Sequence, residues 1–279
     1  MEKLYGVIGD PIGQSMSPDM HNTAFQSLGL QAVYKAFHVT PERLQSAIEG
    51  VRGLGIAGLN VTIPHKISVM KYLDEIDPLA SKIGAVNTIV NKNGKLTGYN
   101  TDGIGYVNSL KEVLIDKKLE NCSILLIGAG GAARAIYFSL LEEGVARLDL
   151  ANRTVEKAEA LVNEQLSSQS RALSLAEAEG VINTYDILIN TTSIGMYPNL
   201  EEIPISLENV NENTIVSDII YNPMQTKWLK EANDKGAITH NGLGMFVFQG
   251  AIAFEKWTGI YPDIDIMKSV ITRKLGGIS

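Results

Sequence analysis

The chain has 279 residues, which at about 150 residues per domain allows roughly two domains, each with its own core. Apolar residues make up 45% of the sequence and charged residues 20%, so the composition is that of a packed globular protein and excludes the disordered, collagen-like and coiled-coil classes. Acidic residues outnumber basic ones by 31 to 24, which argues against a broad surface for nucleic acid or membrane. An anionic ligand therefore needs positive charge placed locally at its site.

The single cysteine and the absence of a long apolar stretch indicate the cellular compartment in which the protein is expected. Cys122 is the single cysteine, so it can form no internal disulfide and no cysteine-based zinc cage, and we expect it to be a buried small hydrophobe. The sequence has no stretch of about 18 uncharged apolar residues, and residues 1–5 show no signal-peptide core. We expect a cytoplasmic protein, in which the Asn-x-Thr triplets at Asn60 and Asn190 are not glycosylated.

Short apolar or β-branched runs alternate with longer segments of helical period, which predicts βα units and a mostly parallel sheet. Helices are predicted to begin after Ser17 and after Thr40, because each of these polar cap residues precedes a proline that suits the first helical position. Asn93-Gly94 predicts a two-residue hairpin turn. The strands predicted in the first hundred residues cover 4–8, 32–39, 55–61, 86–90 and, after that turn, 95–99.

A second lobe is predicted to begin near residues 117–121, where a polar segment precedes a new apolar strand. The predicted elements in this lobe are, in order, strand 123–127, a glycine-rich turn, helix 132–142, strand 147–151, helix 154–166, and strands near 186–190 and 214–218. This order is typical of a Rossmann-like lobe. Residues 242–275 predict two helices, broken near 259–262, that pack back on the first lobe. We expect an α/β fold of two lobes with a cleft between them.

The glycine-rich turn has the sequence Gly128-Ala129-Gly130-Gly131-Ala132-Ala133. Gly128 allows a tight turn, Gly130 lets the backbone approach a diphosphate, and the small Ala133 lets the helix pack closely on the strand. The helix N-terminus adds free N–H groups and the positive end of its dipole. Because glycines cluster in many turns, a purely structural turn is the alternative, and the flanking strand and helix favour a dinucleotide site.

The end of the second strand of this lobe distinguishes NAD from NADP. Asp149 lies about 20 residues after the glycines, where NAD enzymes place an acidic residue, but it precedes the strand end by about three residues and is predicted to point away from the ribose. The strand end itself holds Asn152, Arg153 and Thr154, with Lys157 one turn later. A guanidinium there suits a 2′-phosphate, which favours NADP, and the alternative is that Arg153 and Lys157 are solvated charges.

Four polar clusters in the first lobe are hard to explain by folding alone. They cover residues 9–22, 60–66, 84–88 and 98–103, and three of them follow or border the ends of predicted strands. Open α/β sheets place ligand-binding groups at strand ends. Together the clusters supply hydroxyls, amides, one ammonium and one carboxylate, which are the groups that would bind a small polyhydroxylated acid.

Over essentially its whole length the chain resembles the shikimate dehydrogenase family. The motifs of the resemblance lie at residues 15–17, 60–66, 84–88, 100–102, 128–132, 152–154, 190–196 and 241–245, followed by Gln249. The resemblance implies the cofactor NADP and the reversible conversion of shikimate into 3-dehydroshikimate, on the way to chorismate and the aromatic amino acids. It also implies a substrate-binding and catalytic domain of residues 1–103 with about 250–279, and an NADP-binding domain of residues 104–249.

The resemblance also implies roles for individual residues. Oxidation of an alcohol needs a general base at its hydroxyl, and the matching residue is Lys66, with Asp102 as its partner. Alone, Lys66 would more often be a solvated charge. The residues implied to bind substrate carboxylate and hydroxyls are Ser15, Ser17, Thr62, Asn87, Tyr221 and Gln249, together with Lys66 and Asp102. Ser17 is also a good helix cap, whereas a polar Gln249 inside an apolar helix favours a ligand.

Further cofactor-binding positions follow from the same resemblance. Besides the glycine turn and residues 152–157, they are Thr191, Thr192, Ile219, Gly242 and Met245, although Ile219 could equally be ordinary core. His65 is interpreted as accessory at most, and the other histidines show no metal-ligand spacing, so no metal is expected. The expected partner is the small-molecule substrate, with neither nucleic acid nor membrane, and the chain could be a monomer or a homodimer.

Two alternative functions stay open at this point. The first is a quinate/shikimate dehydrogenase that uses NAD or both nucleotides. Ser17, where that relative commonly has threonine, and Arg153, where an acidic residue would favour NAD, both weigh against it. The second is a non-catalytic NADP-responsive sensor, which predicts loss of the proton-transfer group. The presence of Lys66 and Asp102 argues against a sensor.

Overall fold

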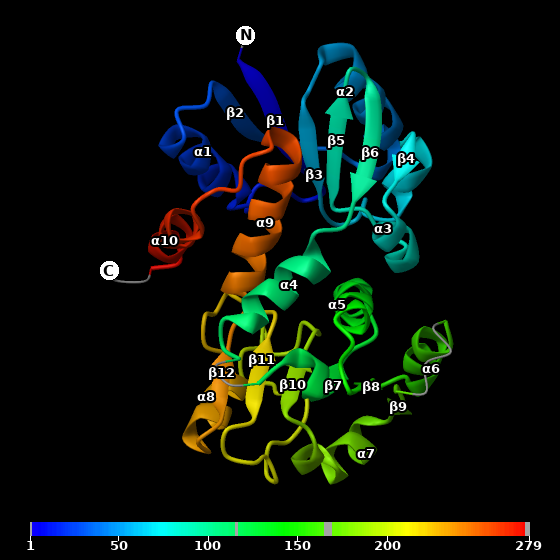
Figure 1. Cartoon of the computed structure of the whole chain (residues 1–279), viewed down its shortest axis with the longest axis vertical. Helices are drawn as coiled ribbons and strands as arrows, with labels where there is room; N and C mark the ends of the chain where they lie inside the picture. The colour runs from blue at the N-terminus through cyan, green and yellow to red at the C-terminus, as the bar shows by residue number, and fades with distance from the viewer. Residues whose placement is uncertain (1, 115–116, 165–168, 277–279) are drawn as a thin grey trace. The chain divides into compact units, whose positions relative to one another are not determined.

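The computed structural model of the chain describes residues 2–114, 117–164 and 169–276 (Figure 1). Packing within the chain divides it into two units. The first unit contains Met1–Gly105 and Val247–Ser279, and the second contains Tyr106–Phe246. The ends of the domain expected at residues 1–103 with about 250–279 include residues 1 and 277–279, which lie outside the described residues.

The first unit is built on a six-stranded sheet of order β2-β1-β3-β5-β6-β4. β1 is parallel to β2 and β3, and β4 is parallel to β6, but β5 is antiparallel to both β3 and β6. The expectation of a mostly parallel sheet is therefore confirmed for this unit, with β5 as the one reversed strand among the described residues, and the tight turn at residues 93–94 joins it antiparallel to β6. The strands are β1 (Lys3–Gly9), β2 (Ala32–His38), β3 (Gly58–Val61), β4 (Glu75–Ile76), β5 (Thr88–Lys92) and β6 (Lys95–Tyr99).

Turn chemistry decides where these strands begin and end. Asn93 and Gly94 both have positive φ, of 55° and 88°, as a two-residue hairpin turn of this kind requires, and β6 occupies the range predicted for it. The strand predicted at 55–61 starts only at Gly58, because Gly55 ends the preceding helix in the left-handed conformation with φ of 66°. The strand predicted at 86–90 is shifted to Thr88–Lys92.

Helices cover the sheet of the first unit. They are α1 (Ser17–Ser27), α2 (Leu44–Leu54) after a 3₁₀ turn at Pro41–Arg43, α3 (Pro78–Ile83), the start of α4 (Asp102–Lys111), most of α9 (Leu243–Thr258) and α10 (Ile264–Lys274). Ser17 is not a cap, since Met16 occupies that position and Ser17 is the first helical residue. Side-chain caps occur instead at Asp77 and Asp263, each of which accepts hydrogen bonds from two backbone N–H groups.

An aromatic cluster joins the first strand of this unit to its C-terminal helices. Tyr5 stacks on Phe25 with ring centroids 5.1 Å apart, and Trp257 of α9 lies 5.2 Å from Tyr5. The Trp257 indole N–H donates to the carbonyl of Ile89 at 2.9 Å, so its one polar atom is satisfied. α10 packs against α1 (Figure 1). Each fully buried large side chain contributes about 1.5–3 kcal/mol, and these contacts confirm that the C-terminal helices pack on the first unit.

The second unit contains an all-parallel sheet of order β12-β11-β10-β7-β8-β9. In chain order this is the doubly wound arrangement 3-2-1-4-5-6 of Rossmann folds, with β7 and β10 on either side of the switch point. The observed α/β architecture confirms the predicted fold class. The strands are β7 (Ser123–Ile127), β8 (Arg147–Ala151), β9 (Ala172–Leu173), β10 (Ile187–Asn190), β11 (Ile215–Asp218) and β12 (Ile238–His240).

Helices on this second sheet complete its core. They are the rest of α4, α5 (Gly131–Glu142), α6 (Val155–Asn163), α7 (Leu175–Gly180) and α8 (Lys227–Asp234). α6 was predicted over 154–166, and residues 165 and 166 of that range lie outside the described residues. Buried apolar side chains such as Leu125, Leu188 and Trp228 form the core between helices and sheet. Apolar residues recur at every second position in the strands and about every 3.6 positions in the helices, so they share the face that points into the core.

The described part of the chain contains no helix that is both long and apolar enough to span a membrane. Cys122 is buried and unpaired, as expected of a small hydrophobic residue, and burial raises the pKa of its thiol.

Packing around Trp257 gives a stability prediction. Gly58 lies directly against the Trp257 indole, so the methyl group of Gly58→Ala would overlap the ring, and we expect a loss of about 1–3 kcal/mol in the free energy of unfolding. The matched control is Gly53→Ala in α2, where an added Cβ meets no atom within 4 Å and helix propensity should add about 0.5–1 kcal/mol. Urea denaturation measures both changes. A Gly58→Ala protein as stable as the unmodified chain would contradict this packing.

Candidate active site

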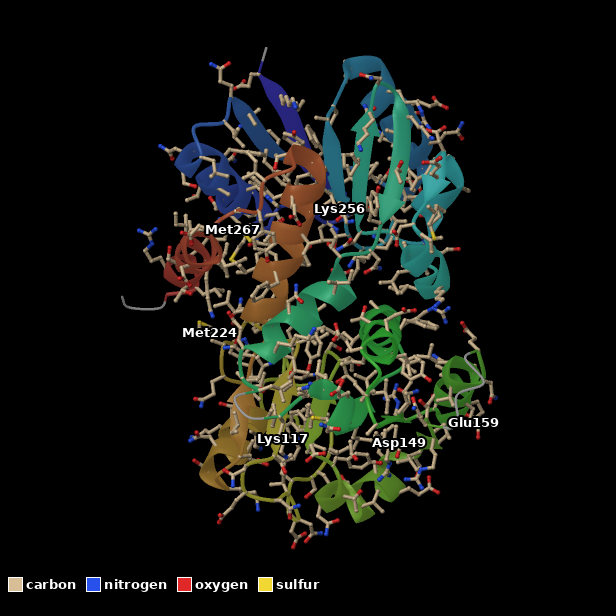
Figure 2. The ribbon with its side chains drawn as sticks, in the orientation of Figure 1. Lys117, Asp149, Glu159, Met224, Lys256 and Met267 are labelled. Carbon is tan, nitrogen blue, oxygen red and sulfur yellow. The ribbon has the colours of Figure 1, made fainter. Side chains whose placement is uncertain are left out.

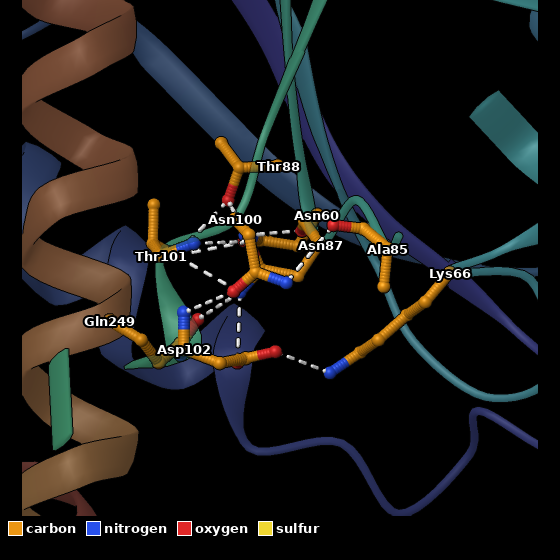
Figure 3. A network of polar contacts seen from close by, with 9 residues as sticks. All are labelled: Asn60, Lys66, Ala85, Asn87, Thr88, Asn100, Thr101, Asp102 and Gln249. Atoms are coloured by element: carbon orange, nitrogen blue, oxygen red, sulfur yellow. Dashed lines mark hydrogen bonds and ion pairs between the residues drawn. The ribbon is translucent and has the colours of Figure 1, made fainter. Parts of the chain in front are cut away.

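An ion pair between an ammonium and a carboxylate lies at the carboxyl end of the first sheet. Lys66 Nζ is 2.7 Å from Oδ2 of Asp102 (Figure 3). Lys66 follows β3, and Asp102 is the first residue of α4, where the positive end of the helix dipole favours a carboxylate. The side chains are 32% and 15% exposed, so the pair is held by protein on one side and remains reachable from solvent.

The loop that presents Lys66 is fixed by hydrogen bonds to its neighbours. The Thr62 N–H donates to the carbonyl of Ile8 at 3.0 Å, and the carbonyl of Lys66 accepts from the N–H of Val86 at 2.8 Å. Nε2 of the buried His65 lies 2.6 Å from the carbonyl of Val39, so this ring nitrogen must be the protonated donor. His65 therefore anchors the loop, in agreement with its interpretation as an accessory residue.

The side chain of Asn87 orients Asp102. Oδ1 of Asn87 accepts from the Thr101 N–H at 2.8 Å, and a backbone N–H can only donate, so this oxygen is assigned without ambiguity. Nδ2 of Asn87 consequently donates to Oδ1 of Asp102 at 2.8 Å and faces Oε1 of Gln249 at 3.5 Å (Figure 3). One oxygen of Asp102 therefore binds Asn87 and the other binds Lys66.

Gln249 reaches this network from a distant part of the sequence. Gly105 of α4 lies directly against the backbone of Gln249 in α9, and a Cβ on Gly105 would come within 2.5 Å of the Gln249 nitrogen. Only a glycine allows this close approach of the two helices. Lys66, Asn87, Asp102 and Gln249, four of the predicted substrate-binding residues, are therefore brought together in the first unit.

Three other predicted substrate residues lie in the segments that follow β1 and β3, and a fourth belongs to the second unit. Ser15 and Ser17 follow β1, and Oγ of Ser15 accepts from the Ser17 N–H at 3.3 Å. Thr62 follows β3, which is parallel to β1, so these three residues are at the same edge of the sheet as Lys66. Tyr221 belongs to the second unit, where its ring packs 5.1 Å from Phe246 and burial raises its pKa.

A polar network that sequence analysis did not assign lies behind these residues. Tyr34 is fully buried, and its hydroxyl donates to Oδ1 of Asn60 at 2.7 Å. Nδ2 of Asn60 donates to Oγ1 of Thr88 at 3.1 Å, and Thr88 in turn donates to Oδ1 of Asn87 at 3.0 Å. Asn60 belongs to the polar cluster at residues 60–66, which the sequence identifies. Its partner Tyr34 gives no sequence signal, because only strand pairing brings the two residues together.

In the second unit, the glycine turn forms a cradle open to an anion. Gly128 has φ of 116°, which only glycine adopts readily, and a Cβ there would lie 2.5 Å from Oγ1 of Thr191. Gly130 precedes the first residue of α5, and added Cβ atoms at Gly130 and Gly131 would meet nothing within 4 Å. The first N–H groups of α5 have no partner within the helix and are available to a diphosphate.

The end of β8 is suited to a second anionic group. Asn152 fixes the turn, with its Nδ2 donating to the carbonyl of Thr154 at 2.7 Å. Arg153 and Lys157 are exposed, and within residues 2–114, 117–164 and 169–276 neither is in an ion pair. Two cations at the first turn of α6 oppose its dipole, so a bound phosphate would relieve their repulsion.

Asp149, labelled in Figure 2, lies in β8 two residues before that strand ends at Ala151, and its side chain is buried. Its Oδ2 lies 2.6 Å from Nη2 of Arg147 and 3.0 Å from Nη2 of Arg171, and it accepts from the Tyr185 hydroxyl at 2.7 Å. Burial raises the pKa of this carboxyl, but hydrogen bonds from Tyr185, Arg171 and Arg147 outweigh burial and hold the pKa below its usual range. The Asp149 carboxylate is therefore occupied by its neighbours in the sheet, and its orientation away from the ribose stays a prediction.

Loops after β10, β11 and β12 meet at the same edge of the second sheet. The Ile219 N–H donates to the carbonyl of Asn190 at 3.1 Å, and the Gly242 N–H donates to the carbonyl of Ile220 at 3.0 Å. Gly242 lies against the Ile219 carbonyl so closely that a Cβ would overlap it. The predicted cofactor residues Thr191, Thr192, Ile219, Gly242 and Met245 all belong to these loops or to the start of α9.

Comparison with known proteins shows the same pattern over the whole chain. Three family models match, described as "Shikimate dehydrogenase substrate binding domain" over residues 7–89, "Shikimate / quinate 5-dehydrogenase" over 110–219 and "Shikimate 5'-dehydrogenase C-terminal domain" over 242–272. The chain is 60% identical over 278 residues to a shikimate dehydrogenase (NADP(+)) of Geobacillus sp. (strain WCH70), which covers 99% of this chain and 100% of that protein.

Solved structures are similar over nearly the full length. A shikimate dehydrogenase in complex with NADP+ is 48% identical, with a TM-score of 0.90 over 98% of this chain and 96% of that chain. A shikimate 5-dehydrogenase of Thermus thermophilus, in complex with NADP(H) and shikimate, is 36% identical, with a TM-score of 0.88 over 97% of this chain and 99% of that chain.

The buried position of Asp149 yields a test by substitution. Asp149→Asn leaves two arginines without a counter-charge, so we expect a loss of about 3 kcal/mol in unfolding free energy at pH 7, with dinucleotide affinity changed less than about twofold. Because the pKa of Asp149 is lower in the folded than in the unfolded protein, its carboxylate stabilises the fold fully above the unfolded pKa near 3.8. This stabilisation is lost as the pH falls through the lower pKa of the folded protein. Denaturation of the unmodified chain and of Asp149→Asn at pH 7 and below pH 4 measures this difference in unfolding free energy. A large loss of dinucleotide affinity would instead place Asp149 in the site.

Proposed function

Since this chain belongs to the shikimate dehydrogenase family, we propose that it catalyses the reversible NADP-dependent reduction of 3-dehydroshikimate to shikimate. Such an enzyme is an oxidoreductase acting on a CH–OH group, in the pathway to chorismate and the aromatic amino acids. The observation that supports it most directly is the Lys66–Asp102 pair at 2.7 Å, flanked by the oriented amides of Asn87 and Gln249.

Lys66 has the position and chemistry of a general acid and base. When bound, NADPH supplies the hydride that adds to the carbonyl carbon of 3-dehydroshikimate. The carbonyl oxygen then needs one proton, which Lys66 Nζ donates from its ion pair with Asp102, and solvent restores that proton. In the reverse direction the neutral amine takes the proton of the 3-hydroxyl. Asp102 orients the amine, and its carboxylate, fixed by Asn87, also accepts a substrate hydroxyl.

Residues around the pair would hold the substrate. Ser15 and Ser17, at the end of β1, offer hydroxyl and N–H donors for the carboxylate. Thr62, Asn87 and Gln249 supply groups for the ring hydroxyls, and we assign Tyr221 as a further substrate-binding residue. The substrate domain then comprises residues 1–103 with about 250–279, and the NADP domain residues 104–249.

The second unit has the groups that a phosphorylated dinucleotide requires. The glycine turn at 128–132 and the N-terminus of α5 suit the diphosphate. Arg153 and Lys157 suit the 2′-phosphate, and Asn152 and Thr154 hold the turn that presents them. Thr191, Thr192, Ile219, Gly242 and Met245 would surround the nicotinamide half. These features favour NADP over NAD.

The proposed activity also bears on the cellular compartment and the oligomeric state of the protein. A buried, unpaired Cys122 suits a reducing compartment, and we place the enzyme in the cytoplasm with its small-molecule substrate. It would act there as a monomer or a homodimer.

Initial rates test the proposed activity. With shikimate as the added organic acid, we expect NADP+ to be reduced, seen as rising NADPH absorbance, with a kcat/KM at least tenfold above that with NAD+. Quinate in place of shikimate should give a lower rate. Faster turnover of quinate, or preference for NAD+, would support the alternative quinate/shikimate dehydrogenase. Absence of turnover with every pair, despite NADP+ binding, would support a sensor.

Removal of the acid/base amine separates catalysis from binding. Lys66→Ala should lower kcat by about 10²-fold or more with a modest change in KM for shikimate, because general acid–base catalysis contributes about 10²–10⁴-fold. The matched control is Lys71→Ala, which removes another ammonium, lying over the Tyr72 ring, in the same segment of chain. Steady-state kinetics of both variants give the comparison. Unchanged kcat in Lys66→Ala would remove this residue from the mechanism.

A further inference from the structure

Asp218 is a buried carboxylate that the proposed mechanism does not use. It is the last residue of β11 and is fully buried. Its Oδ1 accepts from the Ile220 N–H at 3.0 Å and from Nδ2 of Asn190 at 3.2 Å, and its Oδ2 accepts from Oγ1 of Thr226 at 2.9 Å. All three donors are electrically neutral. The buried negative charge is therefore solvated by dipoles and is not cancelled by a cation.

The surroundings of Asp218 are connected to the glycine turn by direct contacts. Gly128 lies against Thr191, the residue after β10, whose hydroxyl donates to the carbonyl of Ile127 at 2.7 Å. Asn190, immediately before Thr191, bonds Asp218 and also holds Thr192, whose N–H donates to Oδ1 of Asn190 at 3.0 Å. Asp218 thus belongs to the same continuous edge of the sheet as the proposed diphosphate site.

The order of the strands decides which half of a dinucleotide would lie along this edge. In a doubly wound sheet the two halves bind on either side of the switch point. The first half, β7 to β9, holds the glycine turn and Arg153 and suits the adenosine part. The second half, β10 to β12, therefore suits the nicotinamide part, and Asp218 ends its middle strand, between β10 and β12.

The charge on Asp218 persists at neutral pH. Burial raises the pKa of this carboxyl to about 6, opposed by the hydrogen bonds from Ile220, Thr226 and Asn190, so the group is ionised at pH 7.5. Among the described residues no lysine, arginine or histidine forms an ion pair with it. Charges inside a protein are screened less than charges in water, so this field reaches the adjacent ligand site.

The nicotinamide ring changes charge in the reaction: it is a cation in NADP+ and neutral in NADPH. We propose that Asp218 sets the selectivity of the cofactor site for oxidation state, because its buried charge stabilises the oxidised ring and has little effect on the reduced ring. This inference rests on the proposed function. It differs from a purely structural role, in which Asp218 ties the loops after β10 and β11 together and supports both forms of the cofactor equally.

Asp149 provides a matched control within the same sheet. It too is a buried aspartate at a strand of the second unit, but Arg147 and Arg171 cancel its charge, and it lies in the half assigned to adenosine. Loss of the carboxylate at Asp149 leaves Arg147 and Arg171 without a counter-charge, but this change lies in the half assigned to adenosine, across the switch point from the half assigned to nicotinamide. Its effect on the two cofactor forms should therefore be equal.

The test is equilibrium binding of NADP+ and NADPH at pH 7.5, by calorimetry or protein fluorescence, without substrate. For Asp218→Asn we expect the Kd of NADP+ to rise about tenfold and that of NADPH to change less than about twofold. Asp149→Asn should leave the ratio of the two Kd values unchanged. Asp218→Glu, which keeps the charge, should keep a ratio near that of the unmodified chain. Asp218→Ser is a second neutral variant should Asp218→Asn not fold.

The outcomes distinguish this inference from the function on which it rests. An equal change in both Kd values for the neutral variants, or no change in either, would overturn the selectivity role and leave Asp218 as a structural residue. Failure of the unmodified chain to bind NADP+ and NADPH at all would instead overturn the proposed function.

Discussion

The backbone N–H of Thr101 can only donate a hydrogen bond, and this constraint orders the site in the first unit. It donates to Oδ1 of Asn87, so the Asn87 amide nitrogen must face Asp102 and Gln249. One oxygen of Asp102 is then occupied, and the other is presented to Lys66. Polar groups fixed in advance of reaction need not reorganise when charge moves, which is how an enzyme favours a proton transfer. The orientation of the Lys66–Asp102 ion pair thus depends on a backbone N–H that only a proline at position 101 would remove.

The second unit shows two ways of burying a carboxylate. An isolated buried charge is costly, so it must be paired or surrounded by donors. Asp149 is paired with Arg147 and Arg171, and its field is cancelled at short range. Asp218 is held by neutral donors and keeps its field. The first arrangement stabilises a sheet, whereas the second costs desolvation and leaves a charge that acts on whatever binds beside it.

Elements bounded by strong turn signals were predictable from the sequence. The strands at 95–99 and 123–127 were predicted with the bounds observed for β6 and β7, because a hairpin turn precedes the first and a glycine-rich turn follows the second. The strand predicted at 147–151 also matches β8. The two- and three-residue strands β4, β9 and β12 were not predicted, since so few residues show no period. Asp218 was missed although a carboxylate ending an apolar run is a usable signal. Tyr34 could not be found, because its contact with Asn60 exists only once β1 pairs with its neighbours.

The residue types at the site and the glycine pattern followed from the sequence alone, because local chemistry, such as the positive φ of a glycine in a turn, acts over a few neighbouring residues. The sequence also determined the family, through motifs spread along the chain. Tertiary structure decided which polar groups meet: Lys66 and Asp102 are 36 positions apart, and Asn87 and Gln249 are 162 apart. It also decided that Asp149 is neutralised and Asp218 is not. Contacts between distant segments depend on sheet order and helix packing, which arise only when the whole unit buries its apolar surface.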